Sequence, residues 1–352
     1  MFKHAVARAS SVAQLGENVS ASALSTPLNA NDGERLSPGQ DWARTRWNSH
    51  ETGAAFDRKK HPYLTPQAKA FVERQEFCVV SFADNNDQLG VRLLYGPLTD
   101  FAKAVDDYHV VIRSFNGISA GLPSSNAQSG GQRLALLFIE FKTRQRLCVH
   151  GISKWEDTGR CLRLEVTQSF FHCPKYIDPS CRLVHTVSTN EPAFKVQKLA
   201  ANGDGELVID HLAGFLTRQR MAFLCTMDRN GQCAVNHRGG TRGFLSLNRV
   251  EAEPWILLPD YAGNGAFEAV GNIHETERAA VLVPDLALAY GICVSGAAKV
   301  LDGDALSAAP AGAKRIIAIH ASHCRVQSWH YALEMQELEQ PLRIAAAEGV
   351  ET

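Results

Sequence analysis

The sequence lacks the features that would place it among membrane, nucleic-acid-binding or disulfide-stapled proteins. Its apolar runs are all much shorter than the roughly 20 residues needed to cross a bilayer. Its formal net charge of −1 provides no overall electrostatic attraction to nucleic acid or anionic lipid. Its nine cysteines are odd in number, scattered and without a Cys-x-x-Cys pair, which argues against a disulfide framework and a zinc ribbon. We therefore expect a cytoplasmic protein with reduced thiols, no metal, and no nucleic-acid or membrane partner.

The N-terminal segment differs in composition from the rest of the chain. Residues 1–29 are rich in Ser and Ala, carry Lys3 and Arg8, and contain no acid before Glu17. This composition is typical of a disordered extension and also of an organellar, for example mitochondrial, transit segment, and both interpretations stay open. We expect residues 1–60 to form a partly disordered extension that precedes the folded domains.

The remainder of the chain contains two copies of one pattern. Residues 71–88 match residues 215–232 at an offset of 144, and residues 147–157 match residues 292–302 at an offset of 145. A period this long indicates two copies of a whole domain rather than a solenoid repeat. With 352 residues, of which 45% are hydrophobic, the chain has room for two buried cores.

Each copy reads as a mainly β domain with a few short helices. An amphipathic helix, at residues 66–74 and again at 211–220, precedes apolar runs of strand length that are separated by turn residues. Antiparallel strands of this kind favour a barrel, because closure removes exposed edges. A further short helix is expected at residues 267–275. The expected boundaries are a first barrel at 61–178, a linker at 179–208, a second barrel at 209–335 and a tail at 336–352.

The two copies differ on two glycine-rich turns, and this difference predicts a ligand site. The second copy has NHRGGTRGF (Asn236 to Phe244) and DYAGNG (Asp260 to Gly265), where the first copy has RLLYG (Arg92 to Gly96) and SFNGIS (Ser114 to Ser119). A residue required by the framework should persist in both copies, whereas a ligand site is needed in only one. Ligand contacts also lie mainly on loops that a rigid scaffold holds. We therefore predict one site, in the second copy.

The first turn suits a phosphate or a carboxylate. Gly239 and Gly240 would let backbone N–H groups approach an anion, while Arg238 and Arg242 offer charge-assisted hydrogen bonds. The second turn suits a planar polar ring. Asp260, Asn264 and the later Asn272 supply donors and acceptors, and Tyr261 supplies a flat face.

These motifs resemble a known family. NHRGGTRGF and LLPDYAGNGAFEAVGN (Leu257 to Asn272) are similar to two motifs of the FMN-binding split barrels related to pyridoxamine 5′-phosphate oxidase. VTQSFFHCPKYI (Val166 to Ile177) in the first copy resembles that family's closing segment. The resemblance covers about residues 60–335. It implies tandem six-stranded Greek-key split β-barrels and FMN as cofactor. The flavin would lie at the junction of the two barrels, which form a pseudo-dimer within one chain, and association of two chains into a homodimer also stays open.

The resemblance also implies which residues contact the cofactor. Lys175 and Tyr176 belong to the copy without the polar cluster, so we predict that they reach across the junction. The motifs depart from the family at Asn236, at Thr241 and Arg242, and at His172. The predicted cofactor-contacting residues are Asn236, His237, Arg238, Gly239, Gly240, Asp260, Tyr261, Gly263, Asn264, Asn272, Lys175 and Tyr176.

The activity that the resemblance implies is an FMN-dependent oxidation or reduction of a small organic molecule. No residue is required to be catalytic, and His237 is the candidate for a proton-transferring role. The alternatives are a flavin-binding protein without turnover, a deazaflavin-dependent reductase, and a haem-binding split barrel with His320 or His330 as axial ligand. His320, His323, Cys324 and His330 resemble a metal set, but strand alternation turns His323 to the opposite face, and we expect no metal.

Overall fold

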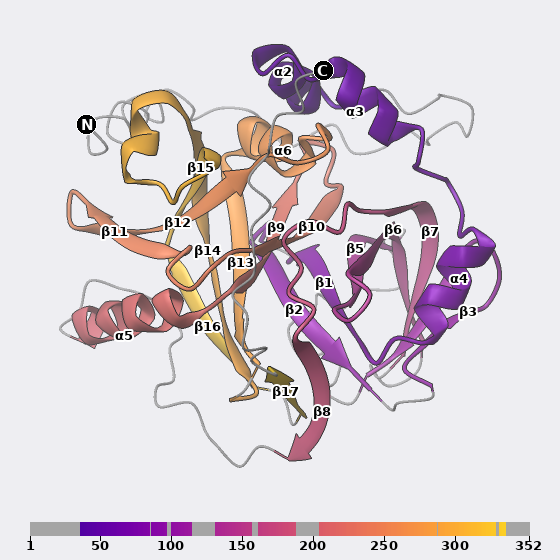
Figure 1. Cartoon of the computed structure of the whole chain (residues 1–352). Helices are drawn as coiled ribbons and strands as arrows, with labels where there is room; N and C mark the ends of the chain where they lie inside the picture. The colour runs from indigo at the N-terminus through magenta and orange to yellow at the C-terminus, as the bar shows by residue number, and fades with distance from the viewer. Residues whose placement is uncertain are drawn as a thin grey trace, which may run out of the picture.

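The computed structural model shows a mainly β protein in which two large antiparallel sheets lie side by side, with helices at the periphery (Figure 1). This confirms the predicted fold class. The residues that the structure describes are 36–84, 86–96, 100–114, 131–156, 161–187, 204–286, 288–328 and 331–335.

The first sheet is built from the first copy of the repeat, and its strand order is β2-β1-β5-β6-β7-β4-β3. The elements before and within it are α2 (Pro38–Arg46), α3 (His50–Asp57), α4 (Pro66–Glu73), β1 (Phe77–Ala83), β2 (Leu89–Tyr95), β3 (Ala102–Ala104), β4 (His109–Arg113), β5 (Gln132–Glu140), β6 (Gln145–Glu156) and β7 (Cys161–Phe171).

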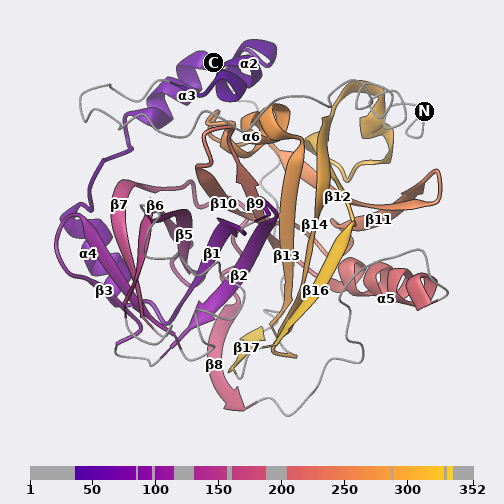
Figure 2. The same ribbon diagram turned by 180° about the vertical axis from the view of Figure 1, so that it is seen from behind.

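The second sheet repeats this order as β10-β9-β13-β14-β15-β12-β11, with β16 added on β14 (Figure 2). Its elements are α5 (Asp204–Arg218), β9 (Met221–Met227), β10 (Cys233–Gly239), β11 (Ser246–Val250), β12 (Glu253–Tyr261), α6 (Glu268–Thr276), β13 (Arg278–Asp285), β14 (Tyr290–Leu301), the 3-10 helix η2 (Gly303–Ala308), β15 (Ala313–His320) and β16 (His323–Ser328). A separate two-stranded sheet pairs β8 (Cys181–Val187) with β17 (Tyr331–Met335).

The sheets have seven and eight strands where six were expected. β7 pairs with the whole length of β6, with a register shift at Gly151, whereas a turn at residues 321–322 divides the equivalent segment into β15 and β16. Gly151 of β6 and Gly296 of β14 lie opposite the point where the neighbouring strand shifts or ends, and both must be glycine for a steric reason. A Cβ at Gly151 would lie 2.3 Å from the carbonyl oxygen of Glu165, and one at Gly296 would lie 2.1 Å from that of His320.

The two halves share a buried apolar seam. Phe77 and Val91 of the first half belong to the same cluster as Phe223 and Val235 of the second, and all four are at most 5% exposed. The contacts are pseudo-symmetric, since the Val235 N–H donates to the Cys148 thiol and the Val91 N–H to the Cys293 thiol. Each large apolar side chain buried there contributes about 1.5–3 kcal/mol. The halves therefore fold against each other as one body.

Three segments differ from the expected organisation. The described end of the N-terminal extension is helical: α2 packs on α6, and α3 packs on α2 and on Gly265 before α6 (Figure 1). Within the expected linker, β8 pairs with β17, and α5 begins at Asp204, seven residues before the predicted start. The predicted helix after the second turn is confirmed as α6.

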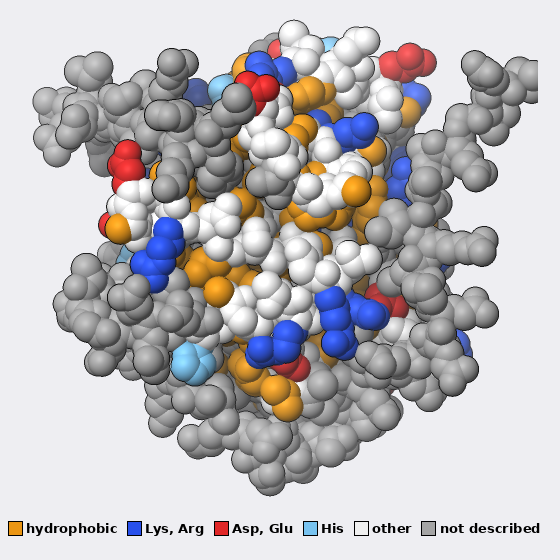
Figure 3. Space-filling model, turned by 60° about the vertical axis from the view of Figure 1, so that its left-hand side comes forward, with side chains coloured by type: hydrophobic (Ala, Val, Ile, Leu, Met, Phe, Trp, Pro, Cys, Tyr) orange, Lys and Arg blue, Asp and Glu red, His pale blue; other side chains and the backbone are white. Residues whose placement is uncertain are grey.

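The surface agrees with the near-neutral charge of the chain. On the face that Figure 3 shows, basic and acidic side chains are scattered among apolar and neutral ones. Among the described residues, no helix is both long enough and apolar enough to span a membrane.

Candidate functional site

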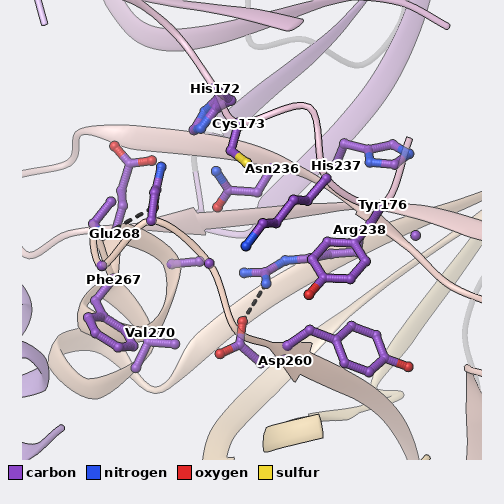
Figure 4. Close-up of a pocket in the computed structure, with 18 of the residues that line it drawn as sticks. His172, Cys173, Tyr176, Asn236, His237, Arg238, Asp260, Phe267, Glu268 and Val270 are labelled. Carbon is purple, nitrogen blue, oxygen red and sulfur yellow. Dashed lines mark hydrogen bonds and ion pairs between the residues drawn. The ribbon is translucent and has the colours of Figure 1, made fainter. Parts of the chain in front are cut away.

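A pocket lies at the seam, with walls from both halves (Figure 4). The first half contributes Arg146 on β6 and residues 172–176, which follow β7. The second half contributes the end of β10, the end of β12 and the loop that leads into α6. Ten of the twelve residues predicted to contact a cofactor line this pocket: Asn236, His237, Arg238, Gly239, Asp260, Tyr261, Gly263, Asn264, Lys175 and Tyr176.

One buried carboxylate between two arginines forms the polar centre of the pocket. Asp260, which is 5% exposed, accepts a hydrogen bond from Nη1 of Arg238 at one oxygen. Its other oxygen accepts from Nε and Nη2 of Arg315, both at 2.7 Å. Arg315 is the register partner of Asp260 on β15, so the pairing of β12 with β15 places the two side chains together.

Sequence reasoning missed Arg315 and Arg146. Nη1 of Arg146 donates to the His237 carbonyl oxygen at 3.1 Å and lies 3.4 Å from Nδ1 of the same residue. Burial, and the nearby charge of Arg238, lower the pKa of Arg146 to about 10. The repeat gave no signal for Arg315, because the offset between the copies grows from 145 at Gly151 and Gly296 to 155 at Glu165 and His320, whose carbonyl oxygens these glycines face.

The pocket walls carry more positive than negative charge. Four cationic residues, Arg146, Lys175, Arg238 and Arg315, face two carboxylates, Asp260 and Glu268, which leaves a surplus of two positive charges. The two histidines of the pocket do not add to it. Burial, with Arg146 and Arg238 nearby, holds the pKa values of His172 and His237 well below their usual range, so both rings are neutral at neutral pH.

Several polar atoms of these walls have no hydrogen-bond partner within the described part of the chain. They are Nε of Arg146, Nε of Arg238, and Nε2 of both His172 and His237, and all four are buried. Leaving a buried polar group unpaired costs about 1–3 kcal/mol. A polar ligand in the pocket would supply the missing partners.

The two halves also meet at an aromatic pair on the pocket wall. The rings of Tyr176 and Tyr261 stack with centroids 5.2 Å apart and an interplanar angle of 25°. The Tyr176 hydroxyl donates to the Ala262 carbonyl oxygen at 3.1 Å. Lys175 and Tyr176 of the first half thus line the same pocket as the polar residues of the second half. Figure 4 shows Tyr176 beside Arg238.

The glycines of the first turn serve packing that the sequence did not reveal. A Cβ at Gly239 would lie 2.0 Å from the Tyr176 carbonyl oxygen, so glycine is needed for the 172–177 segment to cross β10. Gly240 does not line the pocket. Its N–H donates to the Arg220 carbonyl oxygen at 2.9 Å, and a Cβ there would lie 2.7 Å from Phe244. The expectation that the Gly240 N–H is open to an anion was wrong.

Two other predicted polar contacts lie elsewhere. Asn272 is 4% exposed inside α6, does not line the pocket, and donates from its amide to Oγ1 of Thr226 at 3.1 Å. The amide therefore ties α6 to β9. Arg242 is exposed and lies outside the pocket. The arginine that lines the pocket beside Arg238 is Arg315, not Arg242 as we expected.

The residues considered as alternative haem ligands or as a metal set are not assembled at this pocket. His320 lies outside it, with Nδ1 2.6 Å from the Ser322 hydroxyl and Nε2 3.0 Å from Glu253. The turn at 321–322 places His323 and Cys324 on a different strand, and His330 lies outside the described residues. In the described ranges, no group of three or more His, Cys, Asp or Glu is arranged to hold a metal.

Comparison with known proteins finds similarity only at the level of structure. No protein-family model matches the chain, and no curated protein matches it in sequence. Solved structures with a similar fold include HupZ of Group A Streptococcus, at 15% identity and a TM-score of 0.26, over 34% of this chain and 93% of that one.

Two more structures are a candidate pyridoxamine 5′-phosphate oxidase and a haem storage protein. The first, from Lactobacillus delbrueckii, is 18% identical with a TM-score of 0.27, over 38% of this chain and 99% of that one. The second, HutZ from Vibrio cholerae, is 9% identical with a TM-score of 0.23, over 35% of this chain and 95% of that one. Nearly the whole of each of these structures aligns with a little over one third of this chain.

The buried histidines predict that acid destabilises the protein. Above about pH 6.5 the rings of His172 and His237 are neutral in both the folded and the unfolded chain. As the pH falls below 6.5, only the unfolded chain binds the protons. The unfolding free energy should then drop by up to about 1.4 kcal/mol per pH unit for each ring.

Urea titrations between pH 5 and 8 measure this slope. The double variant His172→Gln/His237→Gln should show a shallower decline than the unmodified protein. An unchanged slope would mean that these two rings already take up protons in the folded state.

Proposed function

We propose that the pocket at the seam binds FMN and that the protein is a flavin-dependent oxidoreductase acting on a small organic molecule. The observation that carries the proposal is the surplus of two positive charges on the pocket walls, together with four buried polar atoms that lack partners among the residues that the structure describes. FMN combines a phosphate dianion with a planar ring system that has a polar edge. Its charge and its hydrogen-bonding groups therefore complement these walls.

The proposed roles follow from the chemistry of each side chain. Arg146, Arg238 and Lys175 would hold the phosphate, since all three line the pocket. Within the described structure Arg146 and Lys175 have no carboxylate partner, whereas Arg238 also donates to Asp260. The neutral rings of His172 and His237 would offer Nε2 to the polar edge of the flavin. The chemistry that FMN supplies when bound is hydride transfer at its ring system.

His237 does not fit the role of a proton donor at neutral pH. Its Nδ1 faces an arginine N–H and therefore accepts, which leaves the proton on Nε2. Because its pKa lies well below the usual range, the ring carries no second proton to give. We propose instead that His237 orients the ligand by hydrogen bonding. The segment 172–176, four residues of which line the pocket, would shield the reacting centre from water.

An absorbance spectrum between 300 and 700 nm, with and without added FMN, tests the proposal. Bands near 375 and 450 nm in the protein freed of unbound flavin would support it. A protein that retains FMN but neither oxidises a reduced nicotinamide nor reduces any acceptor would be a flavin-binding protein without turnover. Preference for a deazaflavin over FMN, or a haem band near 400 nm, would overturn the assignment of the cofactor.

Lys175 provides a test of the contribution of the first half. We expect Lys175→Ala to weaken FMN binding by about tenfold, because one charged contact to an anion contributes about 1.5 kcal/mol. Quenching of flavin fluorescence on titration gives the dissociation constant. Lys154→Ala removes a well-exposed lysine on β6, outside the pocket, and should leave the constant unchanged. Equal FMN affinities for the two variants would show that Lys175 does not contact the ligand.

A further inference from the structure

The N-terminal helices α2 and α3 dock on the second half through two glycine contacts. A Cβ at Gly39 would lie 2.2 Å from the Gly271 carbonyl oxygen, and a Cβ at Gly53 would lie 2.7 Å from that of Gly265. The Gly39 N–H donates to Glu275 at 2.6 Å. Backbone therefore packs directly on backbone at both contacts, and the helices lie closer to α6 than side chains would allow.

The same helices hold the pocket loop from behind. The carbonyl oxygen of Ala266, a pocket residue, accepts from Nε2 of Gln40 at 3.1 Å and from Arg44 at 3.4 Å. Arg44 is 2% exposed and pairs with Asp57 of α3 at 2.6 Å. The loop that leads into α6 is thus bonded to a segment that has no counterpart in the repeat.

Trp47, which follows α2 directly, contacts Arg315, the arginine that pairs with Asp260 at the polar centre of the pocket. The guanidinium carbon of Arg315 lies 4.6 Å from the centroid of the Trp47 ring and 4.7 Å from that of Phe267. The two rings stack on each other at 5.3 Å. A guanidinium against two aromatic faces is held by cation–π attraction as well as by packing, and this fixes its orientation.

We propose that Trp47 is a positioning residue for the pocket. It holds Arg315, Arg315 holds the buried carboxylate of Asp260, and Asp260 holds the guanidinium of Arg238 at the pocket wall. Through this chain of contacts, docking of α2 and α3 sets how well the pocket retains an anionic ligand. The part of this inference that concerns FMN rests on the proposed function.

The fold offers a matched control for Trp47 on the same helix. Trp42 stacks on His274 of α6 with centroids 3.6 Å apart and planes 5° apart. It therefore contributes to docking of the helix, yet neither it nor His274 lines the pocket. Trp42 also meets the Trp47 ring in a T-shaped contact, with centroids 5.5 Å apart. Replacing it should loosen the interface, while Phe267 still holds the Trp47 ring beside Arg315.

The first experiment compares FMN affinity and melting temperature across five variants, two of which are Arg315→Gln with and without Trp47→Leu. Trp47→Leu should weaken binding about tenfold, and Trp47→Phe should restore it to within about threefold, since phenylalanine keeps an aromatic face. Trp42→Leu should lower the melting temperature while leaving the affinity unchanged. In an Arg315→Gln background, Trp47→Leu should add no further loss. Equal affinity losses for Trp42→Leu and Trp47→Leu, or additive losses with Arg315→Gln, would overturn the proposal.

The second experiment needs no ligand and therefore separates this inference from the proposed function. Arg315 is 6% exposed, so phenylglyoxal should modify it slowly in the unmodified protein and in Trp42→Leu. In Trp47→Leu the modification should be about tenfold faster, as followed by peptide mass spectrometry. Equal rates in the two variants would show that Trp47 does not hold Arg315. If Arg315 is modified faster in Trp47→Leu but the unmodified protein does not bind FMN, Trp47 positions Arg315 and the assignment of FMN is wrong.

Discussion

Arg238→Ala is expected to weaken FMN binding by about 100-fold. The side chain is the predicted phosphate contact, it lines the pocket, and its Nε is buried without a partner in the described structure. Hydrogen bonds to charged groups contribute about 1.5–3 kcal/mol each, which corresponds to a loss of about 10- to 150-fold. Isothermal titration calorimetry at fixed ionic strength gives the dissociation constants.

Arg242 is the matched control for this experiment. It lies four residues away on the same turn, carries the same charge, and is exposed outside the pocket. Arg242→Ala should therefore change the affinity by less than about twofold. If both variants lost affinity equally, general electrostatic attraction rather than a defined contact at Arg238 would explain binding. If neither did, the anion site would have to lie elsewhere.

Gly239→Ala is expected to have the largest effect on stability. The added Cβ would lie 2.0 Å from the backbone carbonyl of Tyr176, and a backbone atom cannot turn aside as a flexible side chain can. Overpacking of this kind costs roughly 2–3 kcal/mol. The melting temperature should fall by on the order of 5 °C. FMN affinity should fall with it, because the crossing segment that carries Lys175 and Tyr176 must shift.

Gly263→Ala is the control for the glycine experiment. Gly263 also lines the pocket, but no atom of the described residues lies within 4 Å of its added Cβ, and its φ is not in the left-handed region. A methyl group there should change the melting temperature by no more than about 1 °C. A similar loss of stability for both variants would show that the close crossing at Gly239 is not the cause.

The repeat made the architecture predictable from sequence. Because the two copies share apolar positions at a constant offset, they were expected to share a fold, and both sheets have the same strand order. The loops of the second copy were predicted to form a site, and ten of the twelve named residues, two of them from the first copy, line one pocket. The resemblance to a known family supplied the partner loop at Lys175.

The remaining parts of the site depend on contacts between distant segments. Arg146 and Arg315 lie on strands far from both motifs, and strand pairing alone brings them to the pocket. Gly240 and Asn272 were misassigned because a sequence motif does not show which side of the chain faces a cavity. The helices α2 and α3 carry little apolar periodicity, and their packing on Gly265 and Gly271 stabilises them.

The covalent link between the halves changes how the pocket depends on protein concentration. In a homodimer of single barrels, dilution separates the subunits, and a site at their junction is lost by mass action. Here the seam that carries Phe77 and Phe223 joins two parts of one chain, which meet at an effective concentration that dilution does not alter. The affinity of this pocket and the melting of this seam should therefore be the same at nanomolar and at micromolar protein.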